Sequence, residues 1–150
     1  MSIPRVCKRL AEVDFPIAAV SAHSIREKGV RHGHPANLHL WWARRPLAAC
    51  RAILMGLLLP DPADEKCPPE FRDEAARILG PFSGRLKGVK VHQLPREDGG
   101  VERPKAGSEI LRQEILQFIA DFADWDNPSP TVYQQAAREL VKAAHGEEPP

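Results

Sequence analysis

The side chains best suited to chemistry lie together in the N-terminal third of the chain. The run 41–46, WWARRP, places two of the three tryptophans beside the arginine pair Arg44 and Arg45. Aromatic faces stack on nucleobases and guanidinium groups pair with phosphates, so the run favours a nucleic-acid interface. The same residue types also suit a scaffold in which Trp41 or Trp42 fills the core and the arginines bind acidic side chains. The chemistry of the residues leaves both interpretations open.

Histidines form a second group of candidates just before this run. His32, His34 and His39 carry imidazole groups, which bind zinc and iron. No aspartate or glutamate lies between residues 28 and 60 to complete a ligand set, and the polar run REKGVR precedes His32. We therefore expect no metal site. We expect these histidines, with Arg31, to contact phosphate or backbone groups.

Charge separates this third of the chain from the rest. Residues 1–51 hold nine Lys and Arg against three Asp and Glu, a formal net charge of +6, while residues 52–150 carry −5. Only the N-terminal third therefore suits a polyanion such as DNA. The whole chain has 150 residues, of which 43% are hydrophobic, enough for about one domain with a buried core.

Cysteine usage and hydropathy bear on the compartment. Cys7, Cys50 and Cys67 are an odd number without a Cys-x-x-Cys pair, which predicts a reducing environment rather than a disulfide framework. The N-terminus has no apolar signal segment, and the longest apolar run, 47–59, is too short to span a membrane and contains Arg51. We expect a cytoplasmic protein without a membrane segment.

The spacing of apolar residues predicts a mainly α fold with one or two weak strands. We divide the chain into a basic helical segment, a segment with an acidic helix and a Pro- and Gly-rich insertion, and a two-helix segment: 1–62, 63–107 and 108–150. One strand is expected over 86–94, in a hairpin that turns around Asp98, Gly99 and Gly100 inside the insertion. The expected helices are 16–28, 47–59, 70–79, 108–124 and 130–145.

The same patterns predict which side chains are buried. Nearly every face of the helix over 47–59 is apolar, so we expect it to be buried, with Cys50 in the core and Arg51 paired internally. The acidic residues of 61–74 should be solvated, and Ser108 should cap the helix that it begins. The expected apolar faces of the other helices are Ile17, Val20 and Ile25; Leu111, Ile115, Phe118 and Phe122; and Tyr133, Ala137, Leu140 and Ala144.

The run 22–62 resembles the N-terminal signature of a bacterial and archaeal family of adenine-specific (zinc-ribbon-containing) DNA methylases, a region that is a domain of unknown function. A segment of the type REK-x-x-RHGHP-x-x-LHLWWARRPLAA-x-RA recurs in that family. The run 125–128, WDNP, resembles a second landmark of these proteins. The matching positions are Arg26, Glu27, Lys28, Arg31, His32, Gly33, His34, Pro35, Leu38 to Ala49, Arg51 and Ala52.

The resemblance implies that the chain is the N-terminal region of an S-adenosylmethionine-dependent DNA adenine methyltransferase. It implies DNA as a partner, a downstream α/β methyltransferase domain on which the helices pack, and a possible complex of defence-type proteins. Relatives carry their cofactor loop and D-P-P-Y-type catalytic motif further along. Neither occurs before Pro150, so we expect no catalytic residue and no cofactor within this chain.

The candidate nucleic-acid-binding residues are those of the signature. Arg44 and Arg45 should lie at the mouth of the helix that follows Pro46, because the N-terminus of a helix attracts anions. The full set is Arg31, His32, His34, His39, Trp41, Trp42, Arg44 and Arg45. Two alternatives remain open, namely a free-standing nucleic-acid-binding helical module and a non-catalytic protein-interaction domain.

Overall fold

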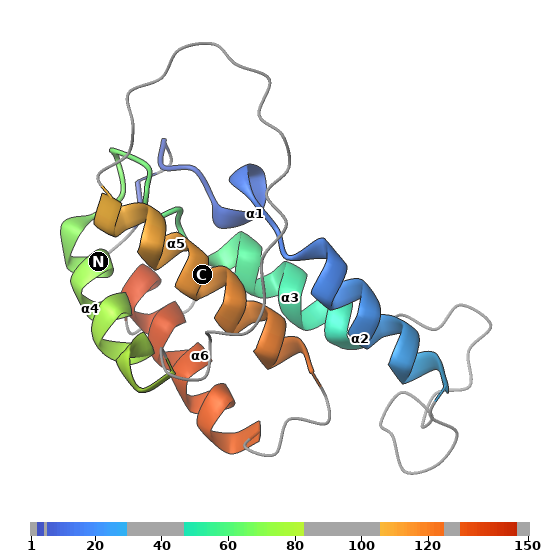
Figure 1. The fold of residues 1–150 in the computed structure, drawn as a ribbon. Coiled ribbons are helices and arrows are strands. Elements are labelled where there is room, and N and C mark those ends of the chain that lie inside the picture. The colour runs from blue at the N-terminus through green and yellow to red at the C-terminus, as the bar shows by residue number, and fades with distance from the viewer. Residues whose placement is uncertain (1–2, 5, 30–46, 83–105, 125–129, 147–150) are drawn as a thin grey trace.

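Helices make up the regular structure in the computed structural model, which describes residues 3–4, 6–29, 47–82, 106–124 and 130–146 (Figure 1). This confirms the mainly α fold. The described residues contain no strand, only an isolated antiparallel bridge between Arg9 and Pro60. The hairpin predicted near 86–94 lies outside the described residues. In chain order the elements are α1 (Leu10–Val13), α2 (Ile17–Gly29), α3 (Leu47–Leu58), α4 (Pro69–Leu79), the 3₁₀ turn η2 (Gly80–Phe82), α5 (Ala106–Ala123) and α6 (Pro130–His145).

The helix boundaries follow the proline and glycine signals closely. Pro16 immediately precedes α2, and its carbonyl accepts the first bond of the helix, from the Val20 amide at 3.1 Å. Gly146 ends α6 with φ 86°, a left-handed conformation that glycine adopts at little cost. Ser108 is not a cap, because α5 begins two residues earlier, at Ala106. The short helix α1 was not predicted from the sequence.

α3 lies at the centre of the arrangement, packed against α1, α2, α5 and α6, and α4 covers α5 and α6 (Figure 1). The spacing of apolar residues in α5 and α6 correctly predicted their inner faces. Seven of the eight predicted residues are buried and the eighth, Phe122, packs against the core from its edge. Phe118 stacks on Tyr133 with ring centroids 5.5 Å apart, and Phe82 of η2 meets both rings edge-on.

A buried ion pair joins the loop after α3 to α5. The Arg112 guanidinium donates two hydrogen bonds of 2.7 Å to the two carboxylate oxygens of Asp61, and both side chains are almost inaccessible to solvent. A third bond, of 2.6 Å, runs from Arg112 to Glu109. The expectation that the acidic residues of 61–74 are solvated is therefore wrong for Asp61, because this carboxylate is the bidentate partner of a buried arginine.

The loop between α3 and α4 is also held from its other sides. Arg72 of α4 donates from Nε to the Pro62 carbonyl at 2.8 Å and from its terminal amino group to the Asp64 carbonyl. The N-terminal segment runs alongside, where the Asp61 amide donates to the Lys8 carbonyl at 2.9 Å and the Lys8 amide donates to Asp64 Oδ2 at 2.9 Å. The N-terminal segment, α4 and α5 thus all bind the short loop between α3 and α4.

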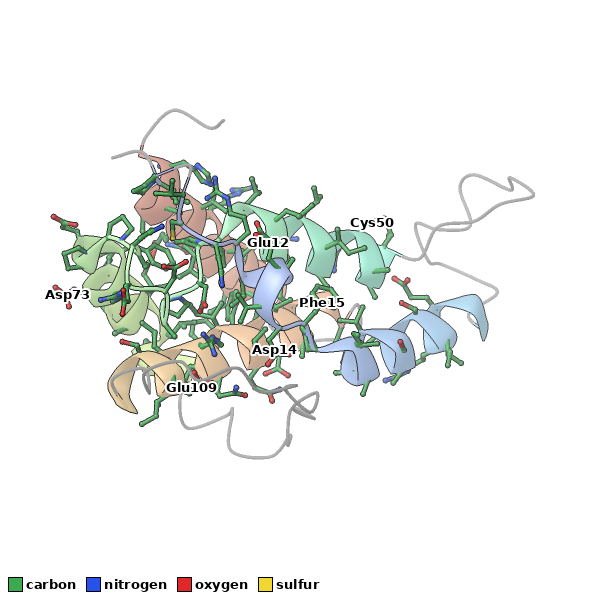
Figure 2. All side chains as sticks on the ribbon, turned by 90° about the horizontal axis from the view of Figure 1, so that it is seen from above. Glu12, Asp14, Phe15, Cys50, Asp73 and Glu109 are labelled. Atoms are coloured by element: carbon green, nitrogen blue, oxygen red, sulfur yellow. The ribbon has the colours of Figure 1, made fainter. Side chains whose placement is uncertain are left out.

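One face of α3 is exposed, so the prediction that this helix is buried all round is wrong. Its buried stripe, which includes Ala48, Ala52 and Met55, lies opposite three large apolar residues that are about half exposed: Ile53 (49%), Leu54 (59%) and Leu57 (51%). Cys50 belongs to the same face and is exposed instead of being a core residue. Figure 2 shows it on the edge of α3 that is turned away from α5.

The outer face of α2 departs from expectation in the same way. Val20 is buried as predicted, but Ile17 and Ile25 are exposed. A helix with so narrow a buried stripe gains little from apolar burial alone, so polar contacts to its neighbours contribute a larger share of what holds α2 in place.

The buried ion pair generates a stability prediction. Asp61→Asn removes the charge that compensates Arg112, so we expect the free energy of unfolding to fall by about 3–5 kcal/mol. Urea unfolding followed by circular dichroism measures the change. The matched control is Glu74→Gln, which breaks the exposed Glu74–Arg77 pair on α4 and should leave the unfolding midpoint unchanged. Equal losses of stability in the two variants would contradict a special role for Asp61.

The exposed face of α3 generates a second prediction. The chain should bind a hydrophobic dye, and Leu54→Gln with Leu57→Gln should reduce the fluorescence of the bound dye while changing the melting temperature little, because both side chains already contact water. Leu59→Ala is the contrasting variant, since Leu59 is fully buried and its truncation should cost about 2–5 kcal/mol. Dye binding that is unaffected by the double substitution would contradict this assignment of the apolar surface.

Candidate nucleic-acid interface

All eight candidate residues, Arg31 to Arg45, fall within residues 30–46, outside the part of the chain that the structure describes. What the structure does place is the framework on both sides of residues 30–46, the central part of the signature: α2 leads into these residues and α3 begins directly after them. The two helices pack against each other, so one helix pair holds the residues on both sides of this central part (Figure 1).

A buried carboxylate ties the two ends together. Glu27, in the last turn of α2, is 7% exposed, and its Oε2 accepts a hydrogen bond of 3.2 Å from the backbone amide of Ala48. Ala48 is the second residue of α3, where backbone amides have no partner within the helix. A carboxylate in this place caps the helix and complements the positive end of its dipole. We call this contact the Glu27 clasp.

The Glu27 clasp corrects the expectation that the N-terminus of α3 is open to anions. The protein's own carboxylate takes the Ala48 amide, so an incoming phosphate would have to displace Glu27 to use that donor. Sequence reasoning missed this role, although one signal was available: Glu27 is the only acidic residue between Asp14 and Asp61. A solitary acid next to a basic segment is a candidate for an internal contact.

Two arginines, one on each side of residues 30–46, have different surroundings. Arg51 of α3 places its guanidinium carbon 5.7 Å from the centre of the Phe122 ring of α5, a cation–π contact that confirms the expected internal role. Arg26, in the turn of α2 that leads into the signature, is exposed.

Polar contacts also link α2 to α5. His23 Nδ1 lies 3.7 Å from Asp124 Oδ1, and Asp121 lies close enough to His23 to interact with it electrostatically. Burial raises the pKa of the Asp121 carboxyl, while hydrogen bonds from Gln117 and Tyr133 and the nearby His23 act against that rise. These contacts join α2, which carries the clasp, to the aromatic core between α5 and α6.

The described residues hold neither a metal site nor a membrane span. No three His, Cys, Asp or Glu side chains among them are grouped so that they could bind a metal ion. No helix in this part of the chain combines the length and the hydropathy that crossing a bilayer requires. His32, His34 and His39 lie outside the described residues.

The Glu27 clasp can be tested directly. Glu27→Ala should remove the acceptor from the Ala48 amide, speed hydrogen exchange at that amide and lower the free energy of unfolding by about 1–3 kcal/mol. Glu27→Gln keeps an oxygen acceptor, so both effects should be smaller. Residue-resolved hydrogen exchange by NMR provides the measurement, with the amide of Ala52, inside α3, as the reference. Unchanged exchange at Ala48 in the alanine variant would show that the clasp does not protect the helix.

Comparison with known proteins gives one finding. A family described as "Protein of unknown function (DUF1156)" matches residues 14–78, a region that includes α2, residues 30–46, α3 and most of α4. No curated protein and no solved structure matches the chain.

Proposed function

We propose that this chain is the helical N-terminal module of an S-adenosylmethionine-dependent DNA adenine methyltransferase, and that residues 31–45 contact DNA. The observation that carries the proposal is the Glu27 clasp, which fixes both ends of the signature on one helix pair. The described helices thus hold the residues before and after this segment in fixed positions, and binding segments are often held by a rigid scaffold. The resemblance of residues 22–62 to the DNA methylases gives the loop its proposed ligand.

Electrostatics support this assignment. The N-terminal third carries a net charge of +6, and Glu27, one of its three acidic residues, is turned inward to α3. This carboxylate is therefore buried and does not form part of the exposed surface. Arg26, in the turn of α2 that precedes residues 30–46, is exposed.

We propose that residues outside this chain carry out the methyl transfer. Methyl transfer to an exocyclic base nitrogen needs a cofactor cradle and a pocket for a flipped base. A Gly-rich strand–turn–helix loop would hold the cofactor, and the described residues contain no strand. We propose that residues further along the full protein supply both the cradle and the pocket, and we assign this module the task of binding the DNA backbone.

DNA binding by the 150-residue chain tests the proposal. Arg44→Ala with Arg45→Ala should weaken binding to duplex DNA and reduce the slope of log K against log salt by about 0.9 for each phosphate that is no longer neutralised, with little change in melting temperature. The matched control is Arg77→Ala with Arg138→Ala, which removes the same charge from exposed positions on α4 and α6 and should leave the slope unchanged. A large fall in stability with an unchanged slope would move Arg44 and Arg45 from the interface to the scaffold.

The parent activity has a separate test. The nucleotide sequence that follows the codon for Pro150 should continue in frame into a strand and a Gly-rich cofactor loop. The protein from that longer frame should transfer labelled methyl groups to adenine in DNA. A stop codon with no such domain, together with salt-sensitive DNA binding by the chain, would leave a free-standing nucleic-acid-binding module.

The exposed apolar face of α3 favours a second candidate, a protein-interaction module. Ile53, Leu54 and Leu57 form a patch without charge on the face of α3 opposite its buried stripe. A chain that binds no DNA would support this candidate over the first.

A further inference from the structure

Two of the three cysteines meet at the loop between α3 and α4. Cys7, in the N-terminal segment, and Cys67, at the end of the loop, are both buried free thiols. Each thiol donates to the carbonyl of the residue that follows it, Cys7 to Lys8 at 3.6 Å and Cys67 to Pro68 at 3.8 Å. Each is also close enough to the other to act on its pKa, although 60 positions separate them in sequence. Cys50 is exposed, so the fold separates one accessible thiol from a buried pair.

The backbone on both sides holds this pair in place. The Asp61 and Leu10 amides donate to the carbonyls of Lys8 and Leu59 at 2.9 and 3.0 Å, which fixes the N-terminal segment against the start of the loop. Asp64 then joins the two cysteine segments, because its side chain accepts from the Lys8 amide at 2.9 Å and its carbonyl accepts from the Cys67 amide at 3.0 Å.

The surroundings favour a bond between the thiols over a metal site. No third His, Cys, Asp or Glu among the described residues joins the pair to form a group able to bind a metal ion. Two neighbouring buried thiols without further ligands can still react with each other. The sequence predicted no disulfide framework from an odd number of cysteines, but the fold itself selects one pair and leaves the third residue out.

We propose that Cys7 and Cys67 form a reversible disulfide that staples the N-terminal segment to the loop carrying Asp61. The two thiols lose two protons and two electrons as the sulfur–sulfur bond forms. A low-molecular-weight disulfide, such as oxidised glutathione, accepts them as its own sulfur–sulfur bond breaks to give two thiols. The staple closes a long loop of chain, which restricts the unfolded state and stabilises the fold.

Burial also determines how fast the pair reacts. It is the largest cause that raises the pKa of Cys67, to about 12, and it raises the pKa of Cys7. The attacking species is the thiolate, so at neutral pH the folded pair exchanges slowly. The rate of cross-linking should therefore rise with pH, while the equilibrium pairing is set by the fold.

The test follows the disulfide directly. The Cys50→Ser variant, which has no exposed thiol, is equilibrated in glutathione buffers of increasing oxidised fraction, and free thiols are then trapped under denaturing conditions with N-ethylmaleimide. As the oxidised fraction rises, we expect Cys7 and Cys67 to stop reacting with N-ethylmaleimide together. The intact oxidised chain should be lighter than the reduced chain by two hydrogens, and its digest should contain a linked peptide pair with Cys7 and Cys67. The melting temperature of the oxidised form should be higher by about 10 °C.

Two controls make the result decisive. Oxidation of the wild-type chain in urea should produce all three pairings, whereas the folded chain should produce only Cys7–Cys67. Cys7→Ser should abolish the difference in melting temperature between oxidised and reduced samples. Glutathione attached separately to each cysteine, retention of both free thiols, or an oxidised form that melts below the reduced form would each overturn the proposal.

Discussion

The bidentate pair between Asp61 and Arg112 is the interaction on which the arrangement of the helices depends. It joins the loop after α3 to the first half of α5, two parts of the chain separated by 51 positions. A buried ion pair of this kind gains little net energy over a well-packed apolar contact, but it is costly to break and demands one geometry. Its contribution is therefore to specify how α3 and α5 meet, while the buried apolar side chains of the core stabilise the fold.

Regular periodicity made much of this fold predictable. The inner faces of α5 and α6 follow from spacings of three and four residues, and the helix ends follow from prolines and glycines. The failures share a cause, because hydropathy describes a residue and not its neighbours. Leu54 and Leu57 are of a residue type that is common in cores, yet no described element covers them. Asp61 is of a type that is common on surfaces, yet it is buried and paired with the Arg112 guanidinium of α5.

The candidate interface shows the same limit of prediction from sequence, namely that a residue's type does not reveal its neighbours. Residue chemistry and charge identify the basic segment as the part of the chain that suits DNA, but neither could show that its two ends are joined. That knowledge needed Glu27 and Ala48 to be placed on two packed helices. The Glu27 carboxylate is the group that joins the last turn of α2 to the start of α3.

The closed ends have a consequence for how this protein can change over time. Once the first and last residues of a segment are held together, lengthening the chain between them adds only the entropy of a larger ring, about 0.6 kcal/mol for each doubling of its length. Insertions between α2 and α3 are thus inexpensive so long as Glu27 and the start of α3 are kept. Selection can alter the length and composition of the chain between α2 and α3 while the two helices stay as they are.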